Sequence, residues 1–400
     1  MPPPIARLPS SGILACTIFL LLATAHEVHA QAPPPAAPPI VEAGLGRGVT
    51  VRSADDSSSM NIRARVQVRG TFSDNTDDAL TGSTEAAIRR MRLVFQGNAL
   101  GPRFAYYVQL GFSNQDTEAD LRLPLRDAYL TWTATRDLVV RVGQMKVPFS
   151  RQRVVSSSAL QMVDRSPVVA ELNLDRDVGI QLFSKDLFGT RRLGYALGLF
   201  GGEGRNRLGR AAGALYSARV ETWPFGPFDD FVESDHHRSR AFRLAIGANA
   251  AHNQNTNRPR STTGDPYPAG DVDYTHLGVD ATVKHRGCSA TWEWTFRRAD
   301  RETSTVGSGS TAAVVQARSG WGTFMQGGCL VTPRLELSAR RSRLAPLRSR
   351  ASPLVESDEY AVGVSHYPRE HNLKLQADYG YEIAQGRHNH QIRSQLQLFF

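Results

Sequence analysis

Apolar and polar residues alternate with a period of two along most of the chain. Between 61 and 69, one face of the pattern carries only small or branched apolar side chains, at Ile62, Ala64, Val66 and Val68. The intervening positions are Arg63, Arg65, Gln67 and Arg69. Successive side chains of a β-strand point to opposite faces, so this pattern predicts strands with one apolar and one polar face.

About 16 segments of this kind follow one another, and most approach the length of roughly 9–11 residues that a tilted transmembrane strand needs. They are expected at 60–72, 87–99, 103–113, 125–134, 137–146, 178–186, 193–201, 213–223, 241–252, 272–286, 287–301, 315–330, 333–343, 357–368, 370–382 and 389–400. Short and long connections mostly alternate, as at the periplasmic and extracellular ends of an outer-membrane barrel. The pattern therefore predicts an all-β fold, a transmembrane antiparallel β-barrel spanning 60–400. The long connection 224–240 falls on the short-turn side and leaves the register there open.

The N-terminal segments predict export. Arg7 precedes an apolar stretch from 13 to 23, and Val28-His29-Ala30 supplies the small residues of a cleavage site, so 1–30 is expected to be a signal peptide. Lipid attachment at Cys16 is disfavoured because most of the apolar stretch follows it. Residues 31–59 are rich in proline and then in Gly, Asp and Ser, which predicts a disordered periplasmic linker.

The last segment is amphipathic and the chain ends on Phe400. Ile392, Leu396 and Leu398 alternate there with polar residues. A terminal strand of this type resembles the signal that the outer-membrane barrel assembly machinery reads. That machinery is therefore an expected partner, and the outer membrane is the expected location.

Composition narrows the partners and the fold. A formal net charge of +9 would suit nucleic acid, but an exported chain rarely meets it, so anionic lipopolysaccharide or an anionic solute is expected instead. A soluble β-sandwich would show similar alternation but would hide its apolar face. Here that face carries tryptophans that suit lipid-facing girdles, namely Trp132, Trp292, Trp294 and Trp321.

Local motifs resemble a known family. Residues 88–97 (IRRMRLVFQG) and 104–107 (FAYY) look like the second and third strands of the phosphate-selective porin O and P family. Residues 127–130 (DAYL), then 138–149 (LVVRVGQMKVPF), resemble its next hairpin, and 156–165 its long inward loop. The resemblance is clear from about 50 to 225 and thins to barrel periodicity beyond.

The resemblance implies a homotrimeric, 16-stranded porin whose third extracellular loop, here 150–177, folds into the lumen. It implies that basic residues conduct phosphate or similar small anions. The chain departs from the family pattern at Val147, where an acidic residue is common, and at Asp164-Arg165, which replaces a Glu-Arg pair. The identity of the anion is therefore not carried over.

The expected anion pathway is a stripe of basic residues. Lumen parity on the first two strands selects Arg63, Arg65, Arg90 and Arg92, judged for the second strand from Met91, Leu93 and Phe95. Arginine keeps its charge and offers a planar fork of donors that suits an oxyanion. Further cations near the inward loop are Arg141, Lys146, Arg151, Arg153 and Arg165. Carboxylates that could pair with them are Asp127, Glu171, Asp175 and Asp177.

Other chemistry is not indicated. The histidines at 236–237 and 388–390 lack a third ligand at metal-site spacing, so we expect neither metal nor cofactor. Ser156 to Ser158 have no nucleophile-elbow glycines, and no other catalytic set stands out, so an enzyme is not expected. An outer-membrane barrel with an enzymatic, adhesive or structural role and no selective conductance is the alternative function.

Cys288 and Cys329 are the cysteines that remain after export. If 287–301 and 315–330 form a hairpin centred near 308, the two residues face each other and can form a disulfide in an oxidising compartment. A shift of one residue would send them to opposite faces, so free thiols remain the alternative.

Overall fold

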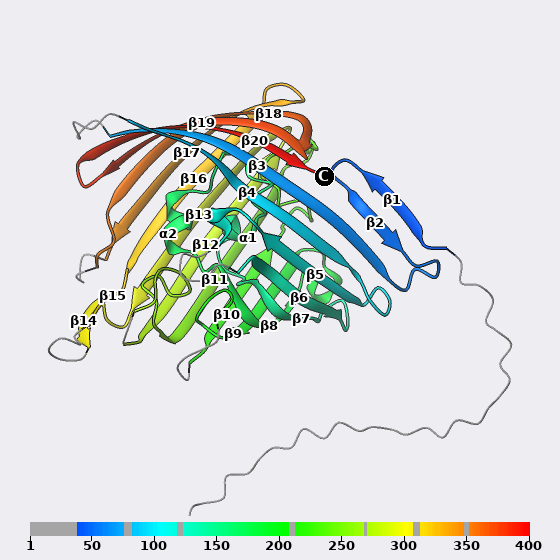
Figure 1. Ribbon diagram of the computed structural model, residues 1–400, viewed down its shortest axis with the longest axis horizontal. Coiled ribbons are helices and arrows are strands. Elements are labelled where there is room, and N and C mark those ends of the chain that lie inside the picture. Colours follow the sequence, from blue (N-terminus) through cyan, green and yellow to red (C-terminus); the bar gives the residue numbers. More distant parts are fainter. Residues whose placement is uncertain are drawn as a thin grey trace, which may run out of the picture. The chain divides into compact units, whose positions relative to one another are not determined.

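The computed structural model describes residues 38–75, 82–117, 123–207, 213–267, 270–306, 313–347 and 352–400 (Figure 1). The predicted signal peptide and the first residues of the predicted linker lie outside these residues. Among the described residues, no helix has the length and apolar character to cross a membrane.

Sixteen antiparallel strands form one closed ring. They are β3 (Ser59–Asn75), β4 (Ser83–Asn98), β5 (Phe104–Gly111), β6 (Leu125–Thr133), β7 (Val139–Lys146), β8 (Arg176–Ser184), β9 (Leu193–Phe200), β10 (Leu215–Thr222), β11 (Arg243–Thr256), β12 (Val272–His285), β13 (Cys288–Ala299), β16 (Gly320–Leu330), β17 (Leu335–Pro346), β18 (Ser357–His371), β19 (Leu373–Ala384) and β20 (Arg387–Phe399). Each pairs with the next, and β20 pairs with β3 to close the ring. Every predicted segment overlaps one of these strands, so the predicted 16-stranded barrel is confirmed.

The barrel is apolar outside and polar inside. Outward residues such as Val68, Leu130 and Ile392 are 47%, 68% and 52% exposed, whereas the inward side chains of Lys374 and Gln397 are fully buried. A soluble protein buries its apolar residues and exposes its polar ones. The reverse arrangement suits a barrel whose outer face meets lipid and whose interior meets water.

Part of the predicted linker is folded, which corrects the expectation of a disordered segment through 59. β1 (Ile40–Gly44) and β2 (Gly48–Arg52) form a hairpin, and β2 pairs with the start of β3 from Val49↔Ile62 to Arg52↔Ser59. The turn between them uses Gly46 at φ 77°, a conformation that glycine adopts without strain. The proline-rich composition upstream masked two short alternating runs.

Residues 147–175 connect β7 to β8 and reach strands on the far side of the ring. They contain α1 (Arg151–Val154) and α2 (Pro167–Leu172), around which the strands curve in Figure 1. Ser166 caps α2 by accepting a hydrogen bond from the backbone N–H of Val169. The apolar face of α2 packs on Phe324 and Leu344 of β16 and β17, which explains why the segment lies here.

The connection between β10 and β11, residues 223–242, is long, as the sequence predicted. β10 and β11 nevertheless pair without a register shift, from Leu215↔Asn253 to Thr222↔Ile246. The connection packs against the segment 147–175 by Phe231 and Val232, and its Glu233 backbone N–H donates to the carbonyl of Ala159 at 3.0 Å. The shorter elements are β14 (Thr303–Val306) and β15 (Ala313–Gln316), a separate hairpin, and the 3-10 turns η1 (Asn114–Asp116) and η2 (Leu187–Gly189).

Cys288 and Cys329 are directly opposite each other in the β13–β16 pair, with 4.0 Å between their Cα atoms, and a disulfide joins them. They share the outward face with Trp292, two pleats along the same strand.

Candidate functional site

A basic stripe lies on the inner face of β3 and β4. Arg65 is opposite Arg92, and Gln67 is opposite Arg90. Like charges placed opposite each other repel, so the pairing needs compensation from elsewhere in the barrel. The segment 147–175 supplies part of it, since the Ser157 hydroxyl accepts from Arg65 at 3.0 Å and from Arg92 at 3.2 Å.

A β-bulge in β4 brings two consecutive arginines to the interior. The register passes from Gln67↔Arg90 to Val68↔Ile88, which leaves Arg89 without a partner on β3. An extra residue at a bulge lets neighbouring side chains share a direction that strict alternation forbids. Strict alternation predicts Arg90 inside but does not predict Arg89 there.

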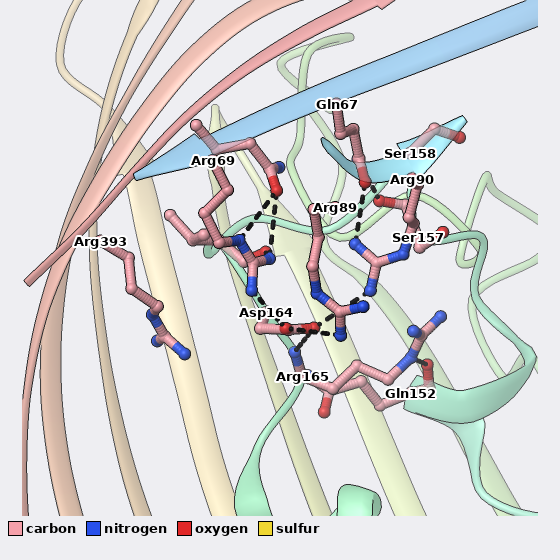
Figure 2. A network of polar contacts seen from close by, with 12 residues as sticks. Gln67, Arg69, Arg89, Arg90, Gln152, Ser157, Ser158, Asp164, Arg165 and Arg393 are labelled. Carbon is pink, nitrogen blue, oxygen red and sulfur yellow. Dashed lines mark hydrogen bonds and ion pairs between the residues drawn. The ribbon is translucent and has the colours of Figure 1, made fainter. Parts of the chain in front are cut away.

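Asp164 lies among three arginines from β3 and β4. Its carboxylate is 2.8 Å from Arg69, 3.2 Å from Arg89 and 3.3 Å from Arg90, and Figure 2 shows the three guanidinium groups converging on it. Burial alone would raise the pKa of Asp164, but Arg90, Arg69 and Arg89 outweigh it and hold that pKa well below its usual value. The contact therefore ties the segment 147–175 to the wall of the barrel by ionised groups.

Asp116 of η1 neutralises part of the same stripe. Its carboxylate is 2.6 Å from Arg92 and 3.2 Å from Arg126 of β6. Burial acts to raise the pKa of Asp116, yet Arg92 and Arg126 prevail and lower it to about 2. The Asp116 carboxylate is thus charged at neutral pH.

A cavity of about 670 Å³ runs along β4 to β10 and the segment 147–175. Its cations are Arg89, Arg90, Arg92, Arg126, Arg141, Lys146, Arg153, Arg165, Arg176, Lys185, Arg205, Arg219 and Arg260. Its carboxylates are Asp116, Asp127, Asp175, Glu221 and Asp265. Thirteen cations against five carboxylates leave an excess of eight positive charges in the lining itself. Asp164 and Asp280, which lie behind the lining and pair with Arg89, Arg90 and Arg219, offset two of these charges.

Six of the nine predicted pathway residues line this cavity, namely Arg90, Arg92, Arg141, Lys146, Arg153 and Arg165. Lys146 donates to the carbonyl of Val154 at 2.7 Å, and Arg165 donates to that of Val155 at 2.6 Å. Burial, with Arg153 nearby, lowers the pKa of Arg165 to about 9, which leaves it charged at neutral pH.

Arg63, Arg65 and Arg151 do not line the cavity. Arg63 donates to Gln96 and lies over the ring of Phe399, and Arg65 is covered by Ser157. Arg151 is held by Glu221, Asp230 and Asp280 at 2.9, 2.6 and 2.5 Å. Burial opposes its charge, but Asp280 and the two other carboxylates raise the pKa of Arg151.

Three of the four predicted acidic partners form ion pairs with arginines. Asp127 is 2.9 Å from Arg176, Glu171 is 2.6 Å from Arg297, and Asp175 contacts both Arg153 and Arg176. Asp177 instead accepts from the backbone N–H groups of Val178 and Gly202.

The sequence carried a signal for the missed Arg89. Ile88 and Met91 are both exposed on the outer face, at 52% and 46%, although they are three residues apart. Strict alternation allows only even spacings on one face, so an odd spacing marks a bulge. Alternation also could not identify Asp116 or the cavity cation Arg205, because both lie in connections between strands, where no periodicity indicates direction.

In the described part of the chain, no three His, Cys, Asp or Glu side chains come together as metal ligands would.

Comparison with solved structures places the fold among outer-membrane channels. An anion-selective porin from Comamonas acidovorans matches with a TM-score of 0.57 and 12% identity, over 86% of this chain and 100% of that one. The outer membrane channel DcaP of Acinetobacter baumannii gives 0.56 and 12% over 87% and 99%. A loop-deletion mutant of OmpT, an outer membrane protein of Vibrio cholerae, gives 0.53 and 12% over 86% and 100%.

Comparison with curated protein sequences gives no match. Comparison with protein-family models gives a match over residues 60–320. All thirteen cavity cations, from Arg89 to Arg260, lie within this range. The barrel, its basic interior and this match agree with the resemblance found in the motifs. The chain belongs to the phosphate-selective porin O and P family and is an outer-membrane anion porin.

Proposed function

We propose that the cavity along β4 to β10 is the conducting path and that it passes phosphate-like oxyanions by diffusion. The excess of eight positive charges in its lining is the observation that carries this proposal. Most of these charges are guanidinium groups, whose planar donors pair well with the oxygens of a tetrahedral anion. An excess of fixed positive charge also raises the local concentration of anions and lowers that of cations.

The cations are spread along the wall rather than gathered in one pocket. Arg92 and Arg126 share Asp116, whereas Lys146 and Arg165 are bonded to loop carbonyls. Each cation therefore has part of its donor capacity in use. Conduction requires sites that attract an ion yet release it, so several partly satisfied cations suit a channel better than one deep site.

The segment 147–175 is proposed to set the width of the path. It is anchored by Asp164 on β3 and β4 and by α2 on β16 and β17. Its backbone carbonyl at Leu160 also accepts from Lys374 of β19 at 2.8 Å. Anchors on opposite sides of the ring would keep the segment across the lumen while ions pass beside it.

Assembly and location complete the proposal. Residues 1–30 are removed on export, and the barrel inserts through recognition of its last strand, ending at Phe400, by the barrel assembly machinery. The outer face then meets lipid and lipopolysaccharide. A homotrimer is proposed because a matched structure of the same fold, OmpT, is described in trimer form. Family and fold point to a channel rather than an enzyme.

Planar-bilayer recording of the purified protein tests the proposed function. A tenfold gradient of potassium chloride should give a reversal potential of the sign for an anion-selective channel. Added phosphate should reduce the chloride current, because the two anions compete for the same cations. A cation-selective or non-selective current would contradict the proposal, and so would chloride current that millimolar phosphate leaves unchanged.

A further inference from the structure

Aromatic rings form a second kind of lining in the same cavity. Tyr107 of β5 and Tyr129 of β6 are paired in register and stack with 5.2 Å between ring centroids. The guanidinium of Arg141 on β7 lies 4.4 Å from the centroid of Tyr129 and 4.8 Å from that of Phe183 on β8. These four side chains line the cavity from four neighbouring strands, and we name them the aromatic wall.

Arg141 is the charged member of the aromatic wall. Its Nε donates to the hydroxyl of Thr131 at 3.2 Å, and no carboxylate of a described residue lies within ion-pair distance. By contrast, Arg92, Arg153 and Arg176 in the same cavity are each paired with a carboxylate. The charge of Arg141 is thus balanced by ring faces rather than by an anion, and it can still receive one.

The faces of aromatic rings do not attract an inorganic anion. The face of an aromatic ring carries partial negative charge, so it repels phosphate, and the apolar ring cannot replace the water that phosphate loses. A planar apolar group gains from the same surface, because it can make edge-to-face contacts with the rings that line the cavity. The aromatic wall therefore suits a solute with an aromatic body and an anionic head.

The size of the cavity agrees with such a solute. A cavity of about 670 Å³ lies within the range of roughly 300–1,000 Å³ typical of sites for small organic ligands. The ring of Phe231, from the connection 223–242, lines it too and lies 4.7 Å from the Lys185 ammonium. Cationic groups and ring faces thus recur together in the lining.

We propose that the aromatic wall selects aryl anions, with phosphate or carboxylate heads, over inorganic and alkyl anions of equal charge. The proposal rests on the proposed function, since it names the class of solute that this anion path favours. The aryl ring packs edge to face against Tyr129 and Phe183, whose facing surfaces Arg141 already covers. The anionic head is held by Arg141 and by the loop cations Arg153 and Arg165.

The test compares phenyl phosphate with methyl phosphate as blockers of chloride current through the full-length protein in planar bilayers. Both carry the same head, so their ratio isolates the ring. Half-blocking concentrations should be about threefold to tenfold lower for phenyl phosphate, the size of one aromatic contact. In the double variant Tyr129→Leu, Phe183→Leu the ratio should fall to near one.

Tyr216→Leu, on the outer face of β10, is the matched control and should keep the wild-type ratio. If the double variant does not fold, Tyr129→Phe should keep the ratio and Tyr129→Leu should reduce it. A ratio near one in the wild type overturns the proposal, as does a wild-type ratio in the folded double variant. Absence of anion-selective current in the wild type would instead overturn the proposed function itself.

Discussion

Replacing Arg90 and Arg92 together by glutamine tests the basic lining most directly. Both side chains line the cavity, and the substitution reduces its excess positive charge from eight to six. The barrel should remain folded, because the partner carboxylates keep other cations. Asp164 retains Arg69 and Arg89, and Asp116 retains Arg126.

The size of the effect follows from the cavity. A sphere of 670 Å³ has a radius of about 5 Å, so a lining charge lies about 7 Å from a passing ion and contributes about 0.6 kcal/mol in water. Screening at about 0.1 M salt halves this contribution. Two charges then give about 0.6 kcal/mol, with opposite sign for anion and cation. The anion-to-cation permeability ratio should fall about fivefold to tenfold.

The assay is the reversal potential in a potassium chloride gradient, recorded at low and at high salt. The matched control is Arg191→Gln with Arg192→Gln, two consecutive arginines that are exposed outside the cavity. The control should keep the wild-type potential, and the effect on the Arg90 and Arg92 pair should shrink as salt rises. A reversal potential unchanged at every salt concentration would refute the selective role of these two residues.

Four further predictions concern the segment 147–175 and the disulfide. Asp164→Asn should raise anion selectivity and increase the fluctuation of single-channel current, because it frees three arginines and one anchor at a cost of about 3–5 kcal/mol to the docked state. Because the pKa of Asp164 is depressed, its ion pairs are complete above the usual carboxyl pKa of about 4 and are lost only as the pH falls below that value. Conductance should therefore be constant between pH 5 and 8, and a change in that range would show that Asp164 is not the anchor. Deleting the central third of 150–177 should raise single-channel conductance, and an unchanged value would show that the segment does not narrow the path. Cys288 and Cys329 should resist alkylation in denatured, unreduced protein weighed by mass spectrometry, and reduction should lower the free energy of unfolding by about 3–4 kcal/mol for a sequence separation of 41 residues.

Strand number and order could be predicted from the sequence because alternation is a local property. Each of the sixteen segments carries its own apolar face, and the membrane requires that face regardless of neighbours. The pairing of β13 with β16 could be predicted because two consecutive antiparallel strands are symmetric about the midpoint of their connection, here near residue 308. The hairpin 40–52 was missed because each of its strands has five residues, too few to show a period beside many prolines.

The sequence does not predict which arginines pair with carboxylates, because the partners come from elements far apart in the sequence. Arg151 and Arg153 are two residues apart on α1, yet Arg151 meets Asp280 of β12 and Asp230, whereas Arg153 meets Asp175 and lines the cavity. Only the docked position of α1 decides between these outcomes. Composition gave the sign of the lumen charge, and tertiary structure gave its distribution.

The contacts of the segment 147–175 straddle the junction where the first and last strands of the barrel meet. Asp164 binds Arg69 of β3, while the neighbouring Val163 N–H donates to Asp378 of β19 at 3.2 Å. Arg69 also reaches Gln395 of β20 directly across that junction. If this segment sets the width of the path, as proposed, the path reaches its final width only after the ends of the sheet have joined. During insertion, an open sheet would leave the contacts across this junction unmade, so we expect closure of the wall and final docking of the segment to coincide.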